Sequence, residues 1–267
     1  MNHEWEITPE AKQLPKLHNP VLIEGLPGIG NVGKIAADFL VESLGATKLY
    51  SFFSYKFPHS VFVGVNNLVE MPKIEMYYKK FNSPKKRDLL ILVGDIQPID
   101  EESCWRFCDE ILNIAKQFKC TEIVTTGGIG LQHVPDKPKV YCTANDPKMF
   151  KDYVQKGMGT EKDIFGIVGP IVGVSGVLLG LGRKRNILGA GLLAETFGHP
   201  MYLGVKGAQE VLNVIERKFQ FGLDLRKMNK DIIEVEKDLI QKTQEWAAEM
   251  SGAAGAKPKK KESSYIG

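Results

Sequence analysis

The sequence predicts an α/β fold: a three-layer sandwich with a mostly parallel sheet and one antiparallel hairpin, followed by C-terminal helices and a flexible tail. Two observations lead to this expectation. Short, continuously apolar runs bounded by Gly, Pro or Asp recur along the chain, and such runs suit strands that are covered on both faces. Segments with helical periodicity lie between them, and strands that alternate with helices build a parallel sheet with helices on its two faces.

The apolar runs and the helical patterns give the elements in chain order. Strands are expected at 21–25, 88–95, 122–128, 163–169 and 191–195. Helices are expected at 31–44, 100–118, 146–157, 174–185 and 207–221. Three of these helices start near a side chain that can accept a hydrogen bond from the amides of the first turn, so the expected N-caps are Asp100, Asp146 and Ser175.

Residues 60–78, SVFVGVNNLVEMPKIEMYY, depart from this rhythm. Apolar and polar residues alternate with a period of two about a turn at Asn66–Asn67, which is the pattern of a β-hairpin. We expect this hairpin to add an antiparallel edge to the sheet. Pro72 suits an edge strand, because proline has no N–H to donate to a neighbouring strand.

The chain is expected to have three parts. Residues 15–222 form the α/β core domain, 223–250 a long C-terminal helix, and 251–267 a disordered tail. In the long helix, steps of three and four residues, interrupted at Lys242, align an apolar stripe that we call the seam: Leu225, Met228, Ile232, Val235, Leu239 and Trp246. The seam must be covered, either by the core domain of the same chain or by a sister subunit.

The tail, SGAAGAKPKKKESSYIG, has too few apolar side chains to fold by itself. Its last three residues, Tyr265, Ile266 and Gly267, bring together an aromatic ring, an aliphatic side chain and the terminal carboxylate. A tethered segment of this kind can dock on a protein that binds the carboxylate and buries the ring. The alternative is an ordinary frayed terminus.

Length, charge and cysteine usage exclude several classes. A chain of 267 residues can bury a substantial core, and most of its small net charge of +3 lies in the tail, so we expect no nucleic-acid partner. It has no apolar run of about 18 residues and no signal-peptide pattern, which favours a cytoplasmic protein without a membrane partner. No metal and no cofactor are expected, because the histidines are scattered and no C-x-x-C pair occurs among Cys104, Cys108, Cys120 and Cys142.

The stretch GLPGIGNVGK, which follows the first apolar run, fits two phosphate-binding templates. It satisfies G-x-G-x-x-G and, ending at Lys34, G-x-x-x-x-G-K. Each template fails a second test: Ile35 replaces the magnesium-binding Ser or Thr, and no acidic residue follows about 20 residues later to bind a ribose. We therefore interpret the stretch as a structural strand-to-helix turn built on Gly25, Gly28, Gly30 and Gly33.

Polar residues at the expected strand ends keep an enzyme as an alternative. Ligands of open α/β sheets bind beyond the carboxyl ends of the strands, where we place Asp95, Ser175 and Glu195, together with Glu24, Thr125 and Thr126. A carboxylate beside a serine can support hydrolysis or phosphorolysis of a small molecule. The segment GVSGV is not a nucleophile elbow, however, since Val177 stands where G-x-S-x-G requires glycine, and we expect no catalytic residue here.

Five stretches, in their order and spacing, resemble the proteasome assembly chaperone 2 family and especially its archaeal members: VLIEGLPGIGNVGKIAADFL, LLILVGDIQP, TTGGIG, GPIVGVSGVLLGLG and GLLAETFGHP. The resemblance extends from about Val21 to Val214. It implies a non-catalytic α/β fold related in shape to the nucleoside phosphorylases, self-association into rings or small oligomers, and a role in proteasome assembly or proteasome binding.

Some archaeal members of that family end in a hydrophobic–tyrosine–any signature, which inserts between proteasome α-subunits. In this chain Tyr265 is third from the end rather than penultimate, and Ser264 precedes it. The resemblance therefore implies a homo-oligomeric chaperone or adaptor that docks Tyr265, Ile266 and Gly267 on the α-ring of the 20S proteasome. The displaced tyrosine leaves open a related assembly chaperone as the partner instead.

Overall fold

The computed structural model describes residues 4–64, 66–164, 166, 169–226 and 228. The chain divides into two compact units, residues 1–225 and 226–267. The fold described below is that of the first unit. Most of the expected long helix at 223–250 and the whole of the tail at 251–267 lie outside the described residues.

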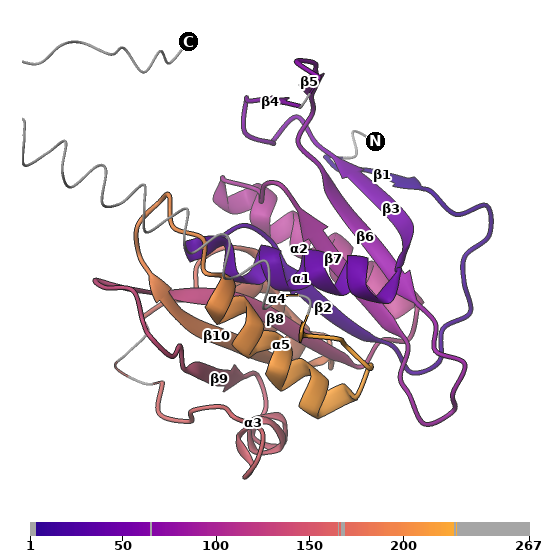
Figure 1. Ribbon diagram of the computed structural model, residues 1–267. Helices are drawn as coiled ribbons and strands as arrows, with labels where there is room; N and C mark the ends of the chain where they lie inside the picture. The colour runs from indigo at the N-terminus through magenta and orange to yellow at the C-terminus, as the bar shows by residue number, and fades with distance from the viewer. Residues whose placement is uncertain (1–3, 65, 165, 167–168, 227, 229–267) are drawn as a thin grey trace, which may run out of the picture. The chain divides into compact units, whose positions relative to one another are not determined.

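An eight-stranded sheet in the order β1–β3–β6–β7–β2–β8–β10–β9 forms the middle layer of this unit (Figure 1). Its centre consists of four parallel strands, β7 (Leu89–Gly94), β2 (Val21–Gly25), β8 (Glu122–Leu131) and β10 (Leu188–Phe197). Antiparallel strands flank the centre, namely β1 (Glu6–Pro9), β3 (Thr47–Phe53) and β6 (Ile74–Lys79) on one side and β9 (Val140–Ala144) on the other.

Helices cover both faces of the sheet (Figure 1). One face carries α1 (Val32–Leu44) and α5 (Val205–Phe219), and the other carries α2 (Glu101–Gln117) and α4 (Val174–Lys184). A short helix, α3 (Pro147–Val154), packs beside β9. The predicted three-layer α/β fold is confirmed, with the parallel strands at its centre.

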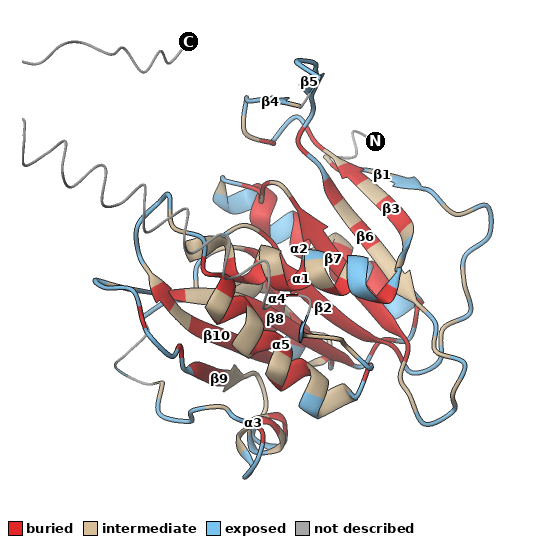
Figure 2. Cartoon of the chain, in the orientation of Figure 1, coloured by how far each residue is buried: buried red, intermediate tan, exposed pale blue. Residues whose placement is uncertain are grey.

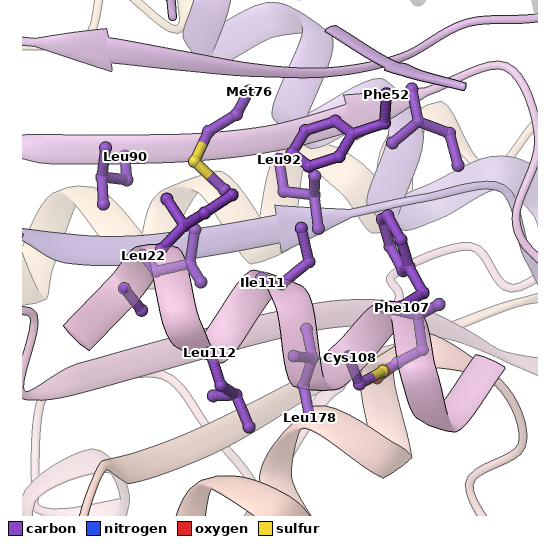
Figure 3. Packing of buried hydrophobic residues seen from close by; sticks show 14 of the residues in the cluster. Leu22, Phe52, Met76, Leu90, Leu92, Phe107, Cys108, Ile111, Leu112 and Leu178 are labelled. Carbon is purple, nitrogen blue, oxygen red and sulfur yellow. The ribbon is translucent and has the colours of Figure 1, made fainter. Parts of the chain in front are cut away.

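The central strands are buried because each is covered from both sides. Every residue of β2 and β7 is buried, as the continuous apolar runs predicted (Figure 2). On the face of α2 and α4, the apolar stripe of α2 packs against the sheet in the cluster of Figure 3: Leu22, Phe52, Met76, Leu90, Leu92, Phe107, Cys108, Ile111, Leu112 and Leu178. This packing fixes the ends of the parallel strands, where the candidate site lies.

The N-caps are partly as expected. Asp100 caps α2 by accepting a hydrogen bond from the amide of Ser103 at 3.0 Å, and Asp146 caps α3 by accepting one from the amide of Lys148 at 2.9 Å. The prediction for Ser175 is wrong, since α4 begins one residue earlier and its N-cap is Gly173 with φ 87°. No side chain can cap from Gly173, so Ser175 is free to bond elsewhere.

Two strand predictions need correction. No strand forms over the described residues of 163–169, where Gly166 adopts φ 83°, a left-handed conformation that a strand excludes. The section 60–78 does form a hairpin, of β4 (Phe62–Val63) and β5 (Val69–Glu70), but as a separate two-stranded sheet. The antiparallel strand that joins the main sheet is β6, which lies inside it between β3 and β7, and Pro72 precedes that strand.

The four cysteines are buried and form no disulfide. Within the described part of the chain, no three metal-ligating side chains gather. No helix among the described residues is long and apolar enough to cross a membrane.

Candidate functional site at the carboxyl ends of the parallel strands

The glycine turn joins β2 to α1 through a very close backbone approach. A Cβ atom on Gly25 would lie 2.1 Å from the carbonyl oxygen of Gly33 and 2.6 Å from the Cβ of Ala37. A Cβ atom on Gly33 would in turn lie 2.5 Å from the carbonyl oxygen of Thr126 in β8. Any side chain at these two positions would push the helix off the sheet.

The other two glycines of the turn differ from each other. Gly30 has φ 62°, and a Cβ atom there would lie 2.6 Å from Oγ1 of Thr196. Gly28 has an extended backbone with φ −158° and open space where a Cβ would be. The backbone conformation and the close neighbour both require glycine at position 30. Neither reason applies at Gly28.

Lys34, which completes the phosphate-loop pattern, is held by carboxylates. Its Nζ lies 3.0 Å from Asp38 and 3.3 Å from Asp95. Ile35 follows in α1 and has no oxygen to offer a magnesium ion. Lys34 is therefore already paired with two carboxylates, and the residue after it cannot bind a magnesium ion.

Glu24, the fourth residue of β2, is fully buried at the carboxyl end of the central strand. One of its carboxylate oxygens accepts a hydrogen bond from the amide of Leu26 at 3.0 Å, and the other accepts one from the hydroxyl of Ser175 at 2.8 Å. Burial raises the pKa of Glu24 to about 7, although these hydrogen bonds oppose the shift. Glu24 is therefore a fully buried carboxyl group whose pKa lies near neutral pH.

Gln97 joins the same region from the loop after β7. Its side chain donates to the carbonyl oxygen of Pro27 at 2.7 Å and accepts from the amide of Val174 at 3.2 Å. Together with the bond between Glu24 and Ser175, this links the glycine turn to the first turn of α4. Nothing in the spacing of the motifs pointed to Gln97, although it lies within the stretch LLILVGDIQP.

Two threonines of β8 complete the buried part of the site. Thr126 donates its hydroxyl proton to the carbonyl oxygen of Glu24 at 2.8 Å, and Thr125 beside it is buried. Thr126 therefore joins the two central strands, β8 and β2, through its side chain.

Asp95 lies in a separate, solvent-facing pocket of about 300 Å³. It contacts Lys34 and accepts a weak hydrogen bond from the amide of Lys73 at 3.3 Å. Burial raises the pKa of the neighbouring Asp38, and the charges of Asp95 and Glu75 raise it further. The pocket holds acids and lysines that already pair with each other.

Glu195 lies elsewhere, in β10 beside β9. It accepts hydrogen bonds from the amide of Lys139 at 2.9 Å and from the hydroxyl of Tyr141 at 3.3 Å. Asp95, Ser175 and Glu195 thus each have their own hydrogen-bond partners and do not form one catalytic cluster.

The predicted partner-docking residues Tyr265, Ile266 and Gly267 lie outside the described residues. Of the seam, Leu225 ends the first unit and Met228 belongs to the second. The seam residues Ile232, Val235, Leu239 and Trp246 also lie outside the described part.

Residues 22–251 match the model of the PAC2 family, which is most of the chain. The chain belongs to the PAC2 family. Its fold is shared with PbaB of Pyrococcus furiosus, an archaeal proteasome activator whose crystal structure superposes with a TM-score of 0.80 at 31% identity over 89% of this chain and 98% of that one.

Two further proteins extend the comparison. PbaA of Pyrococcus furiosus, an archaeal homolog of proteasome-assembly chaperone, superposes with a TM-score of 0.72 at 22% identity over 94% of this chain and 97% of that one, a likeness that concerns the fold alone. The uncharacterized protein MJ1210 of Methanocaldococcus jannaschii is 29% identical over 98% of this chain and 97% of its own. Homology to proteasome assembly chaperone-like proteins therefore covers nearly the whole length.

Proposed function

We propose that this chain is a non-catalytic, homo-oligomeric proteasome assembly chaperone or proteasome-binding adaptor. The observation that carries the proposal is the likeness to PbaB, a proteasome activator, over 89% of this chain and 98% of that one. Membership of the PAC2 family also supports a proteasome-related role.

A binding role also fits the carboxyl ends of the strands. The polar groups there already have hydrogen-bond partners within the chain. Glu24 accepts from Ser175 and from the amide of Leu26, Asp95 from Lys34, and Glu195 from the amide of Lys139. An acyl- or phosphoryl-transfer site needs a nucleophile and a base within reach of an open reaction site. Ser175 is instead bonded to a carboxylate that is fully buried.

The contact with the proteasome is proposed to run through the tail at 251–267. Tyr265, Ile266 and Gly267 form the docking peptide on the α-ring, and the basic stretch before them supplies reach. Several tails on one oligomer would strengthen an individually weak contact through effective concentration.

The oligomer is proposed to form through the seam, because an exposed stripe of this length would otherwise favour aggregation. Replacing Ile232 and Leu239 by Glu in the full chain should lower the mass measured by light scattering. Replacing Lys230 and Lys237 by Gln is the matched control, since it changes the net charge by the same −2 without removing apolar side chains. An unchanged mass in the seam variant would rule out the seam as an interface.

The proteasome contact is tested by capture of purified 20S proteasome, or of α-subunit rings alone. The full chain, a variant lacking residues 265–267 and Tyr265→Ala are compared, with Ser264→Ala as a control in the same tail. Binding that is lost in the first two variants and kept in the control supports docking by the tail. Binding that survives the deletion places the contact elsewhere on the protein.

A second candidate partner is a related assembly chaperone, favoured by the position of Tyr265 one residue away from the proteasome-docking signature. Under this alternative the full chain captures no α-rings but captures a PAC2 protein from the same cell. Capture of α-rings by the full chain would exclude it as the main role.

A further inference from the structure

The hairpin of β4 and β5 exposes the apolar side chains of its described residues. Figure 1 shows it projecting beyond the ends of β3 and β6, and Figure 2 shows most of it exposed. The residues that we call the hairpin surface are between 44% and 96% exposed: Tyr55, Val61, Phe62, Val63, Leu68, Val69 and Met71. Large exposed apolar patches on soluble proteins usually mark interaction sites.

The hairpin is built by local bonds rather than by contact with the core. The amide of Gly64 donates to the carbonyl oxygen of Leu68 at 2.9 Å, and Asn67 takes the left-handed conformation with φ 59°. Val63 pairs with Val69 across the two strands. A two-stranded hairpin without a packed face is only marginally stable in water. This hairpin would therefore become more stable if another surface covered it.

The exposed area matches what a specific interface requires. With about 180 Å² for a fully exposed residue of this size, the hairpin surface offers roughly 800 Å². This equals one partner's share of a standard protein interface, about 800 Å². Because Phe62 and Val63 are adjacent in β4 and point to opposite faces, a partner must contact both faces of the hairpin to cover this whole area.

Charge points to a second copy as the partner. Glu70 is the only charged residue from Ser60 to Met71, and Nζ of Lys73 lies 3.9 Å from it, with both side chains more than half exposed. An adjacent acid and base can exchange partners across a two-fold axis, so that Glu70 of each copy meets Lys73 of the other. The hairpin has no excess charge that would select a strongly acidic or basic protein.

We propose that the hairpin surface is a self-association interface, where the hairpin of one copy packs on the hairpin of a second copy. The proposal deepens the homo-oligomer put forward above and rests on it, but it uses a surface separate from the seam. Apolar side chains are removed from water, and the free strand edges of the two hairpins can pair in an antiparallel manner.

The first test removes the apolar surface while keeping the hairpin. In the full chain, Val63→Lys with Val69→Glu places opposite charges across the strand pair, which preserves their attraction. Leu14→Lys with Val172→Glu is the matched control, with the same charge changes at exposed apolar residues elsewhere. We expect the hairpin variant to have a lower mass by light scattering and about tenfold weaker self-association in a dilution series, while the control matches the parent.

The second test does not depend on the hairpin variant folding. Val69→Cys, with the four native cysteines buried, should form a covalent dimer on mild oxidation, and Val172→Cys should not. An unchanged mass in the first test, or no cross-link at Val69 above the level at Val172, would overturn the proposal. Unchanged mass with lost α-ring capture would assign the hairpin to a foreign protein instead. The mass and cross-linking measurements do not involve the proteasome, so both remain interpretable if the proteasome role fails.

Discussion

The two ends of the parallel strands each bury a glutamate, and they satisfy it differently. At the carboxyl end, Glu24 has hydroxyl and amide partners, and its pKa is raised to about 7 by burial. At the amino end, Glu122 in β8 pairs with the guanidinium of Arg87 and accepts a hydrogen bond from Tyr153 at 2.8 Å. Glu122 is therefore paired with a cation, whereas Glu24 is held by hydrogen bonds from uncharged groups beside the close backbone packing of the glycine turn.

The largest expected effect is at the glycine turn of the carboxyl end. Gly33→Ala places a methyl group 2.5 Å from a backbone oxygen of β8, so it should destabilise the fold by about 3–4 kcal/mol in urea unfolding. Gly28→Ala is the matched control, because its Cβ meets open space, and it should stay within about 1 kcal/mol of the parent. Equal losses in the two variants would contradict the role given to close packing.

The next largest effect is expected from breaking the ion pair between Arg87 and Glu122 at the amino end. Arg87→Met leaves Glu122 buried without its cation and should cost about 3 kcal/mol of unfolding free energy. Adding Glu122→Gln removes the unpaired charge and should restore part of the loss, which a double-mutant cycle measures. If the double variant is less stable than Arg87→Met alone, charge pairing is not what holds this end.

The buried glutamate of the carboxyl end predicts a pH dependence. The folded state holds the Glu24 proton more tightly than the unfolded state, so its stabilising contribution is complete below about pH 4.5 and is lost as the pH rises through about 7. Glu24→Gln keeps the shape but does not ionise, and should be more stable than the parent at pH 8 by about 2 kcal/mol. Unfolding free energies at pH 5 and pH 8 test this, and parallel pH profiles would contradict it.

The smallest effects sharpen the comparison, because both ends carry a helix cap. Asp100→Ala at the carboxyl end and Asp146→Ala at the amino end each remove a side-chain acceptor for a first-turn amide. Each should lower the thermal midpoint by about 2–4 °C. Similar losses would show that the two ends differ in their glutamates rather than in their helix caps, and a large difference would show the opposite.

Much of the fold could be predicted because its signals are local. The continuous apolar runs predicted the strands β2, β7, β8 and β10. The capping residues Asp100 and Asp146 predicted where α2 and α3 begin. The strand β3 was missed because its sequence, TKLYSFF, mixes polar and aromatic residues, and its place depends on pairing with β6 and β1.

The candidate site was less accessible to prediction. The run VLIEG placed Glu24 among polar residues at a strand end, but its burial was not predicted and its partner Ser175 lies 151 residues away. Gln97 belongs to no recognised sequence motif, and its hydrogen bonds form only because the fold brings Pro27 and Val174 beside it. Contacts between distant segments depend on the assembled sheet, so residue spacing alone could not assign them.

The order of the sheet has a consequence for synthesis. The strand β2 emerges first among the central four, yet its two neighbours are β7 and β8, which end at Gly94 and Leu131. Until the ribosome has released both, a strand that is fully buried in the finished fold lacks at least one of its hydrogen-bonded neighbours, in the state most exposed to misassembly. A nascent chain that stops short of β8 should therefore need protection by chaperones more than the finished protein does.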